Sequence, residues 1–455
     1  MTIAEYLSSY AYDLQFSDLP KDVIHEAKRR VIDSFGCAIR AFDAEPCRIA
    51  RKIAQSVNVS EGATILGTSK KTLPDLAAFA NGAMIRYLDC NDTYLSKEPA
   101  HPSDNIGAAL AVAETEGTSG RDLITAIVLA YEVQCRLCDV ASLRSRGWDH
   151  VTYGAFSTAL CSAKLMKLSK KSMQHALGLA GVANVALRQT RVGELSMWKG
   201  CAFANAARNG VFAALLAGEG MTGPAPIFEG EKGFMKLVSG QFGLHKFGSD
   251  NVPFKILETC IKHFPVEYHA QSAVEAALDL GRELQKKEGS NFISSIKSLE
   301  IQSSGAAIEI IGSGSERWNP QTRETADHSL PYCVAAALMD GTITIDSFSI
   351  RSMKDKKLRG LLQNIIVTED KQFTKNYPEK ISNRIIVHTH RKYVKQVDYP
   401  RGHPKNYMTS KELGEKFRSL TTGKLGKAKG EKVLDSLWSL EKSSIGDIMS
   451  MVKVG

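Results

Sequence analysis

Polar side chains gather directly after a run of small and apolar residues that ends at Leu88. They are Asp89, Asp92, Thr93 and, after a short loop with a proline, His101. Ser103 is a suitable N-cap for a helix that would begin just after it, and a helix N-terminus offers unpaired N–H groups to an anion. His101 is thus placed to bind or protonate a carboxylate. The local alternative is that His101 only satisfies its loop while Asp89 pairs with Arg86.

Two more basic side chains have comparable settings. His150 stands at the entry of an Ala-rich segment, as His101 does at its own. Lys199, bracketed by Trp198 and Gly200, precedes another segment of small residues and is expected to be partly buried. A buried lysine needs an anionic partner or a lowered pKa. Lys199 is therefore either a functional cation or one half of a structural salt bridge.

Three polar clusters follow in the second half of the chain, at 262–271, 325–332 and 398–405. Their candidate residues are Lys262, Glu267, His269, Tyr332 and Arg401. The first cluster lies at a predicted domain boundary, where ligand sites are frequent. Ser329, as a helix N-cap, explains part of the second cluster without a function. Together with the earlier residues, these side chains suit acid–base chemistry on a substrate that carries several negative charges.

Signatures of several other enzyme classes are missing from the sequence. It has no G-x-x-x-x-G-K-[ST], no G-x-G-x-x-G after a strand, no H-E-x-x-H and no G-x-S-x-G, so nucleotide-binding, zinc-protease and esterase functions lose their usual support. The nine cysteines are scattered in Ala-rich segments, which is typical of reduced core residues. Cys135 and Cys138 have the spacing of a metal or redox pair, but no second pair accompanies them, and no three cysteines cluster as iron–sulfur ligands do. We expect no metal and no other cofactor.

The composition indicates an ordinary globular chain. With 43% hydrophobic and 24% charged residues, it has no signature of disorder. The net charge of +9 is spread along the chain, which favours a solvated surface over nucleic-acid binding and also suits a polycarboxylate substrate. We find no secretory leader and no run of about 18 uncharged apolar residues, so we expect a cytoplasmic enzyme without a membrane partner.

The elements that position these side chains fall into two groups. Six segments rich in Ala and Gly predict a compact helical bundle, at 73–88, 106–116, 122–140, 151–168, 172–186 and 200–217. Short β-branched segments predict strands at 298–302, 364–368, 383–390 and 393–397, with helices over 268–288 and 329–339 and again from Ser410. The fold is therefore expected to be mainly α. A large all-helical domain (1–259 and 399–455) would carry a smaller α/β lid domain (260–398), inserted before the C-terminal helices.

Six motifs, in this order, resemble those of the MmgE/PrpD family. They are Arg86–Tyr94, His101–Asn105, Trp198–Gly200, Phe264–Gln271, Ala326–Tyr332 and Tyr399–His403. The resemblance runs through nearly the whole chain and implies the same two-domain fold, a homodimer and a cavity for a small polycarboxylate. The residues that it places in that cavity are Asp89, Thr93, His101, His150, Lys199, Lys262 and Tyr332.

Glu267 bears on the branch of the family. A decarboxylase of the family is expected to have a histidine two residues after the Phe264-Pro265 pair, whereas this chain has Glu267 followed by Tyr268 and His269. The resemblance therefore implies a hydro-lyase that dehydrates 2-methylcitrate or a similar hydroxy-tricarboxylate to an aconitate-type alkene. Decarboxylation of cis-aconitate, epimerisation of a small dicarboxylate and anion binding without catalysis stay open as alternatives.

The expected dehydration assigns roles to the candidate residues. His101 and His150 would serve as base and acid, in an order that the sequence does not fix, and Asp89 would orient a histidine or a lysine and tune its pKa. The substrate carboxylates would be held by Lys199, Lys262 and Arg401.

Overall fold

The structure is a computed structural model that describes residues 1–454, and the chain forms two compact units. The first unit comprises Met1–Arg191, Trp198–Cys260 and the C-terminal segment from Thr409. The second comprises Val192–Met197 and Ile261–Met408. None of the helices between residues 1 and 454 combines the length and the hydropathy that a transmembrane helix needs.

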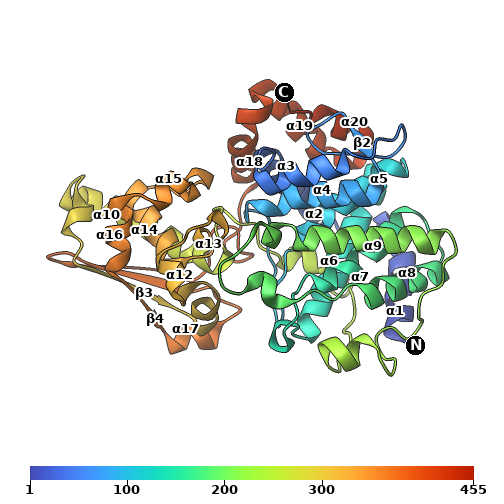
Figure 1. The fold of residues 1–455 in the computed structure, drawn as a ribbon, viewed down its shortest axis with the longest axis horizontal. Helices are drawn as coiled ribbons and strands as arrows, with labels where there is room; N and C mark the ends of the chain where they lie inside the picture. The colour runs from blue at the N-terminus through green and yellow to red at the C-terminus, as the bar shows by residue number, and fades with distance from the viewer. Residues whose placement is uncertain (455) are drawn as a thin grey trace. The chain divides into compact units, whose positions relative to one another are not determined.

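The first unit is a bundle of helices, as the Ala- and Gly-rich segments predict (Figure 1). Its helices are α1 (Ile3–Asp13), α2 (Lys21–Arg40), α3 (Glu45–Ala54), α4 (Pro74–Tyr87), α5 (Ile106–Thr115), α6 (Gly120–Val140), α7 (Thr152–Leu165), α8 (Lys170–Ala183), α9 (Ala202–Gly218), α18 (Ser410–Leu425), α19 (Lys427–Trp438) and α20 (Ile445–Met451). The unit also holds a short antiparallel pair, β1 (Ala63–Thr64) and β2 (Lys71–Thr72). Strands of two residues are too short to give a sequence pattern, so this departure from an all-helical unit was not predictable.

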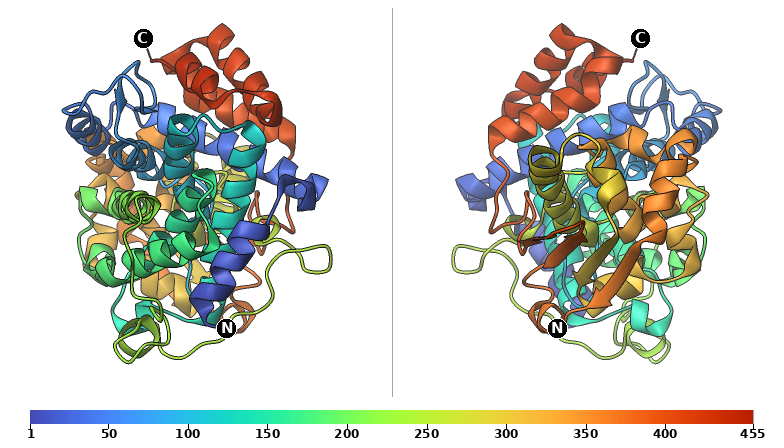
Figure 2. Two further views of the ribbon diagram at one scale, coloured as in Figure 1. Left: turned by 90° about the vertical axis from the view of Figure 1, so that its right-hand side faces the viewer. Right: turned by 90° about the vertical axis from the view of Figure 1, so that its left-hand side faces the viewer.

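The C-terminal helices pack back on the N-terminal ones within the first unit. Helices α18 and α19 both contact α2 (Figure 2). Lys416 on α18 reaches Asp33 on α2, with 2.6 Å between Nζ and Oδ1, and also donates to the carbonyl of Cys90. Both charged groups are buried, and Lys416 thus ties α18 to α2 through the ion pair and to the segment that follows α4 through the carbonyl of Cys90.

Close helix packing in the first unit depends on glycines at facing positions. A Cβ on Gly107 of α5 would lie 2.7 Å from the backbone nitrogen of Gly82 on α4. Such a distance is too short for a non-bonded contact, so the two backbones touch because neither has a side chain there. The contact fixes α4, which carries Asp89 just after its end, against α5, which follows His101.

Replacing Gly107 with alanine should therefore destabilise the first unit. We expect a loss of about 1 to 3 kcal/mol in the free energy of unfolding, because the added methyl group must push α4 and α5 apart. Gly423→Ala is the matched control, since Gly423 lies in α18 and a Cβ added there would meet no atom within 4 Å. That variant should be neutral or more stable by up to about 1 kcal/mol. Urea unfolding of both variants measures the effect, and equal stabilities would contradict the close approach of the two backbones.

The second unit is built on a mixed sheet with the order β4-β3-β5-β6. Its strands are β3 (Ser298–Ser303), β4 (Ile365–Glu369), β5 (Asn383–His388) and β6 (Lys392–Val397), with β3 and β4 parallel and the other pairs antiparallel. All four lie where the β-branched segments predict them. A parallel pair needs a long crossover, which the chain between β3 and β4 supplies with a series of helices.

Helices α10 (Gln271–Glu288) and α14 (Leu330–Asp340) contact each other and cover one face of this sheet (Figure 1). Burial alternates along β3, so that Leu299 and Ile301 point into the core with α10 and α14. The chain is therefore mainly α with a smaller α/β part, as the sequence predicts.

Candidate active site

Asp89 is placed by an unusual turn at the end of α4. Its φ of 52° lies in the left-handed region, which a residue with a side chain rarely adopts although Asp and Asn tolerate it best. The turn directs the carboxylate back toward the helix, where it pairs with Arg86. Nζ of Lys199 lies 3.5 Å from the same carboxylate oxygen. Both predicted partnerships of Asp89, with Arg86 and with a lysine, are thus present.

Lys199 is brought to Asp89 by a close backbone contact. Gly200 follows it, and a Cβ on Gly200 would lie 3.4 Å from Cα of Tyr87, the last residue of α4. The beginning of α9 therefore lies against the end of α4. Asp89, Arg86 and Lys199 are all buried, so one carboxylate faces two cations in a region of low dielectric. Arg86 also lies 3.6 Å from Oδ2 of Asp104, so two cations and two carboxylates meet here.

His101 has a partner at each ring nitrogen. Nδ1 lies 2.7 Å from the carbonyl oxygen of Asp92, and Nε2 lies 3.0 Å from Nη2 of Arg86. A carbonyl oxygen can only accept and a guanidinium can only donate, so Nδ1 carries the proton of the ring and the lone pair of Nε2 accepts a hydrogen bond from Arg86. His101 is therefore held as the neutral Nδ1–H tautomer.

His150 has a different environment although its ring is close to that of His101. The two ring centroids are 5.8 Å apart, with the planes inclined at 63°. Nδ1 of His150 lies 2.8 Å from Oδ1 of Asp149. Its Nε2 has no hydrogen-bond partner among residues 1–454. An imidazole that donates from Nδ1 to a carboxylate and leaves Nε2 unoccupied has the form of a general base.

Asp149 is itself held in place by Arg191. Nε of Arg191 lies 2.9 Å from Oδ2 of Asp149, while Oδ1 faces His150 and also accepts from the backbone N–H of Val151 at 3.4 Å. Burial alone would raise the pKa of Asp149, but the charges of Arg191 and His150 overcome it and lower that pKa well below its usual value. Asp149 is consequently a permanent anion behind His150.

A second buried carboxylate near His101 has the opposite behaviour. Oδ1 of Asp104 accepts from Asn91 at 2.7 Å, while its Oδ2 lies 3.6 Å from Nε of Arg86. Burial raises the pKa of Asp104 to about 7, and the charge of Arg86 only partly opposes that rise. Asp104 therefore changes its charge near neutral pH beside the arginine that contacts His101.

Thr93 and Asp92 have structural partners in the same loop. The hydroxyl of Thr93 donates to the carbonyl of Ala100 at 3.1 Å, and its backbone pairs with Cys260. Asp92 accepts from the hydroxyl of Tyr131 at 2.6 Å and from the backbone N–H of Ser103 at 3.0 Å. These contacts fix the loop that presents His101, so in this arrangement both side chains support the site by positioning.

In the second unit, the predicted residues Glu267 and His269 form a pair. Oε1 of Glu267 lies 2.9 Å from Nδ1 of His269, and the backbone N–H of His269 donates to Oε2 at 2.7 Å. Burial opposes ionisation, but the charges of His269, His328 and Lys262 lower the pKa of Glu267 to about 2. The predicted Lys262 thus belongs to the same charged cluster. Its carboxylate, Glu267, is ionised at neutral pH.

Tyr332 and Arg401 make contacts of another kind. The hydroxyl of Tyr332 donates to the carbonyl of Ser347 at 2.7 Å, inside the hydrophobic core of the second unit. Arg401 donates from Nη1 to Asn406 at 2.8 Å, and its backbone N–H donates to Glu275 at 2.9 Å. A buried tyrosine hydroxyl ordinarily has a hydrogen-bond acceptor, and the carbonyl of Ser347 is the acceptor for Tyr332.

Asp149, Arg191 and Asp104 belong to the cluster around the histidines but were not predicted from the sequence. An Asp directly before a His occurs at Asp149-His150 and again at Asp327-His328, and in both pairs the carboxylate holds Nδ1 of the imidazole, at 2.8 and 2.6 Å. The dipeptide Asp-His is thus the sequence signal by which Asp149 could have been found.

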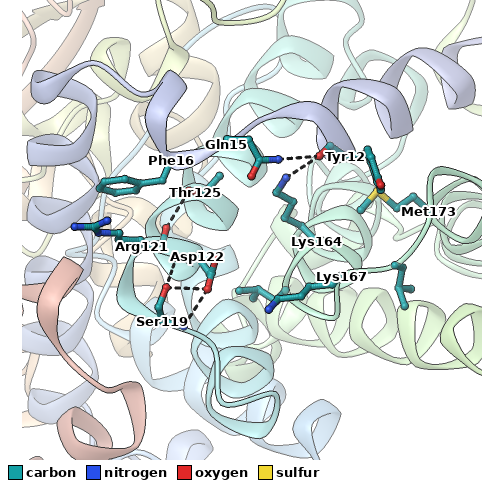
Figure 3. A pocket seen from close by; sticks show the side chains of 12 residues that line it. Tyr12, Gln15, Phe16, Ser119, Arg121, Asp122, Thr125, Lys164, Lys167 and Met173 are labelled. Atoms are coloured by element: carbon teal, nitrogen blue, oxygen red, sulfur yellow. Dashed lines mark hydrogen bonds between the residues drawn. The ribbon is translucent and has the colours of Figure 1, made fainter.

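A hollow elsewhere in the first unit holds none of the candidate residues. It has a volume of about 460 Å³ and is lined by the end of α1, the beginning of α6 and the end of α7 (Figure 3). Lys164 points across it and donates to the carbonyl of Tyr12 at 3.0 Å. Its ammonium group therefore caps the C-terminal end of α1. Between residues 1 and 454, no group of three or more His, Cys, Asp or Glu side chains is arranged to hold a metal ion.

Comparison with curated proteins finds dehydratases of citrate-type acids. The chain is 30% identical over 452 residues to a 2-methylcitrate dehydratase of Escherichia coli strain K12, covering 91% of this chain and 88% of that protein. It is 32% identical over 391 residues to a probable 2-methylcitrate dehydratase of Saccharomyces cerevisiae, covering 78% and 72%. A fungal alkylcitrate dehydratase is 27% identical over 443 residues, covering 90% and 86%.

Two family models match consecutive parts of the sequence. The MmgE/PrpD N-terminal domain matches residues 5–246, which contain Asp89, His101, His150 and Lys199. The MmgE/PrpD C-terminal domain matches residues 264–440, which contain Glu267, His269, Tyr332 and Arg401. These matches cover most of the chain, and they agree with the six motifs of the sequence: the chain belongs to the MmgE/PrpD family.

Proposed function

We propose that this chain is a hydro-lyase that removes water from 2-methylcitrate or a similar hydroxy-tricarboxylate and gives an aconitate-type alkene. The observation that carries the proposal is the pair of imidazoles, 5.8 Å apart, beside the cluster of Arg86, Asp89 and Lys199. The names of the similar proteins support a citrate-type substrate.

The elimination needs three contributions from the protein. A base must take a proton from the carbon next to a carboxylate, cations must stabilise the negative charge that develops there, and the hydroxide that leaves must gain a proton. The imidazoles provide ring nitrogens that can donate or accept a proton. Arg86 and Lys199 provide two cations beside Asp89, and in this proposal they face a carboxylate of the substrate.

Lys262 and Arg401 extend the proposal to the second unit. The charges of both act on carboxylates of their own unit, since Lys262 contributes, after His269 and His328, to the lowered pKa of Glu267, and the charge of Arg401 opposes the rise that burial causes in the pKa of Glu275. We propose that they bind carboxylate groups of the substrate. Glu267, which stands where a decarboxylase of the family is expected to have histidine, favours elimination over loss of CO₂.

Purified protein should convert 2-methylcitrate into an alkene. The product is followed by its ultraviolet absorbance and identified by NMR, with citrate, isocitrate and longer alkylcitrates tested in parallel, because a pocket that accepts one extra methylene discriminates by only about 10- to 200-fold. Release of CO₂ from cis-aconitate would favour a decarboxylase instead. Uptake of solvent deuterium into unchanged substrate would indicate an epimerase. Folded protein that converts none of these acids would refute the proposal.

A further inference from the structure

The two histidines differ in whether they can receive a proton. In His101 the lone pair of Nε2 already accepts from Arg86, and Nδ1 donates to the carbonyl of Asp92. Any proton that His101 takes must first displace the guanidinium, and the resulting imidazolium would face the positive charge of Arg86. His101 is therefore a poor proton acceptor in this arrangement.

His150 has the opposite arrangement at the same two atoms. Its Nδ1 donates to Asp149, and its Nε2 has no hydrogen-bond partner among the described residues. A proton taken up at Nε2 would produce an imidazolium whose other N–H points at an anion. The charge that forms is then balanced at once, which lowers the energy of the protonated state.

Asp149 is fixed in the position that this role requires. Oδ2 is held by Nε of Arg191 at 2.9 Å, and the backbone N–H of Asp149 donates to the carbonyl of Ala186 at 2.8 Å. Arg191 in turn donates from Nη1 to the carbonyl of Lys199 at 3.2 Å. Rotation of the Asp149 carboxylate would break the contact with Arg191, so Oδ1 stays aimed at His150 and keeps the proton of the imidazole on Nδ1.

We propose that Asp149 is a positioning residue that makes Nε2 of His150 the proton acceptor of the reaction. His101, held by Arg86, instead binds and orients the substrate. The inference rests on the proposed function and assigns the base that the sequence leaves undecided. Nε2 takes the proton from the substrate carbon, the electron pair of the C–H bond becomes the second bond of the alkene, and the C–O bond breaks. The departing hydroxide gains a proton from water, and His150 then returns its own proton to solvent.

The charged or titratable groups around His150 come from three segments. Asp149 precedes it in the chain, Arg191 ends the 3₁₀ turn Arg188–Arg191, and His101 comes from the loop before α5. Of the groups in direct contact with His150, Asp149 is the anion. Removing its charge should consequently make protonation of His150 harder, and it should do so without a direct contact to the substrate.

Asp149→Asn tests the assignment through the rate and its pH dependence. We expect kcat/KM to fall by about 10- to 100-fold with KM changed less than kcat, because losing the carboxylate that orients a histidine typically costs that much. The pH at which kcat/KM reaches half its maximum should move down by about one unit or more, since an opposite charge at this distance shifts a histidine by that amount. In His150→Gln the remaining kcat/KM should no longer rise with pH in this range. In His101→Gln the pH of half-maximal kcat/KM should be unchanged.

Glu132→Gln is the matched control for stability. Glu132 is also a buried carboxylate of the first unit held by an arginine, with 3.1 Å between Oε2 and Nε of Arg136, and it accepts from the backbone N–H of Gly248 at 2.9 Å. This variant should lose thermal stability as Asp149→Asn does but keep the pH profile of the wild type. A profile that shifts equally in both variants, or that loses its half-maximum only in His101→Gln, would overturn the assignment.

An NMR measurement separates this inference from the proposed function. Long-range ¹H–¹⁵N spectra of protein labelled at histidine nitrogens, assigned with His150→Gln, should show the proton of His150 on Nδ1, and Asp149→Asn should weaken or abolish that preference. A proton on Nε2 of His150 in the wild type would overturn the inference even if the enzyme dehydrates 2-methylcitrate. If none of the tested acids reacts, the proposed function fails, and the reaction role of His150 fails with it whatever the tautomer.

Discussion

Replacing Asp89 with alanine should reduce the free energy of unfolding by about 3 to 5 kcal/mol, the usual cost of removing one partner from a buried ion pair. The reason is that Arg86 and Lys199 share the carboxylate of Asp89 and both cations are almost wholly buried, while the carboxyl group of Asp104, 3.6 Å from Arg86, has a pKa raised to about 7 by burial. Without Asp89 they repel each other in a region where water cannot screen them. We also expect kcat/KM to fall by about 100-fold or more, because the cations that bind and stabilise substrate charge lose their orientation.

Asp89→Asn separates the charge from the backbone turn. Asparagine tolerates the left-handed conformation at φ 52° about as well as aspartate, so this variant keeps the turn and removes only the charge. It should retain most of the loss seen in the alanine variant. Asp13→Ala is the control for an exposed ion pair, since Asp13 and its partner Lys170 lie at the surface, and it should change stability by less than about 1 kcal/mol. Urea unfolding and steady-state kinetics measure both quantities, and an Asp89→Asn variant close to wild type would contradict the role of the charge.

The helices and strands were predictable because their signals are local. The small residues of α4, α5, α7 and α9 follow one another in the sequence, and the alternation of Leu299 and Ile301 in β3 is visible in six residues. The tail was predictable for the same reason, since its apolar residues repeat with helical spacing. Where a short element depends on the fold around it, as with β1 and β2, the local pattern is not enough.

The candidate site was predictable only in part, because its pairs join distant segments. The sequence indicates that His101 and His150 each precede a helix. It does not indicate that Arg86 donates to Nε2 of His101 while Asp149 accepts from Nδ1 of His150. Asp149 and Arg191 are 42 residues apart, and nothing in the local sequence of either residue names its partner. For Tyr332, the motif suggests a place in the site and gives no sign that its hydroxyl donates to the carbonyl of Ser347 in the core.

Asp104 should make the first unit less stable as pH rises from about 4 to about 7. Its pKa is raised in the folded state from 3.8 to about 7, chiefly by burial. Between these values the folded protein keeps the proton that the unfolded chain has released, so each pH step lowers the stability, and above pH 7 the penalty is constant. Summed over the window, the loss is on the order of 4 kcal/mol, because a rise of one in pH costs about 1.4 kcal/mol there.

Asp104→Asn should remove this dependence and so reveal it. The amide oxygen of asparagine can still accept from Asn91, whereas its NH₂ group would face Nε of Arg86, where the carboxylate oxygen now lies at 3.6 Å. That unfavourable contact costs stability equally at every pH, so the decisive quantity is the slope: the stability of the variant relative to wild type should rise between pH 5 and pH 7 and then level off. Glu441→Gln should give a flat difference over the same range, since Glu441 pairs with Lys28 away from the histidines and its lowered pKa confines its effect to pH values below about 4.5. Parallel slopes for the two variants in urea unfolding at pH 5, 6, 7 and 8 would show that Asp104 is ionised throughout, and that Arg86 outweighs its burial.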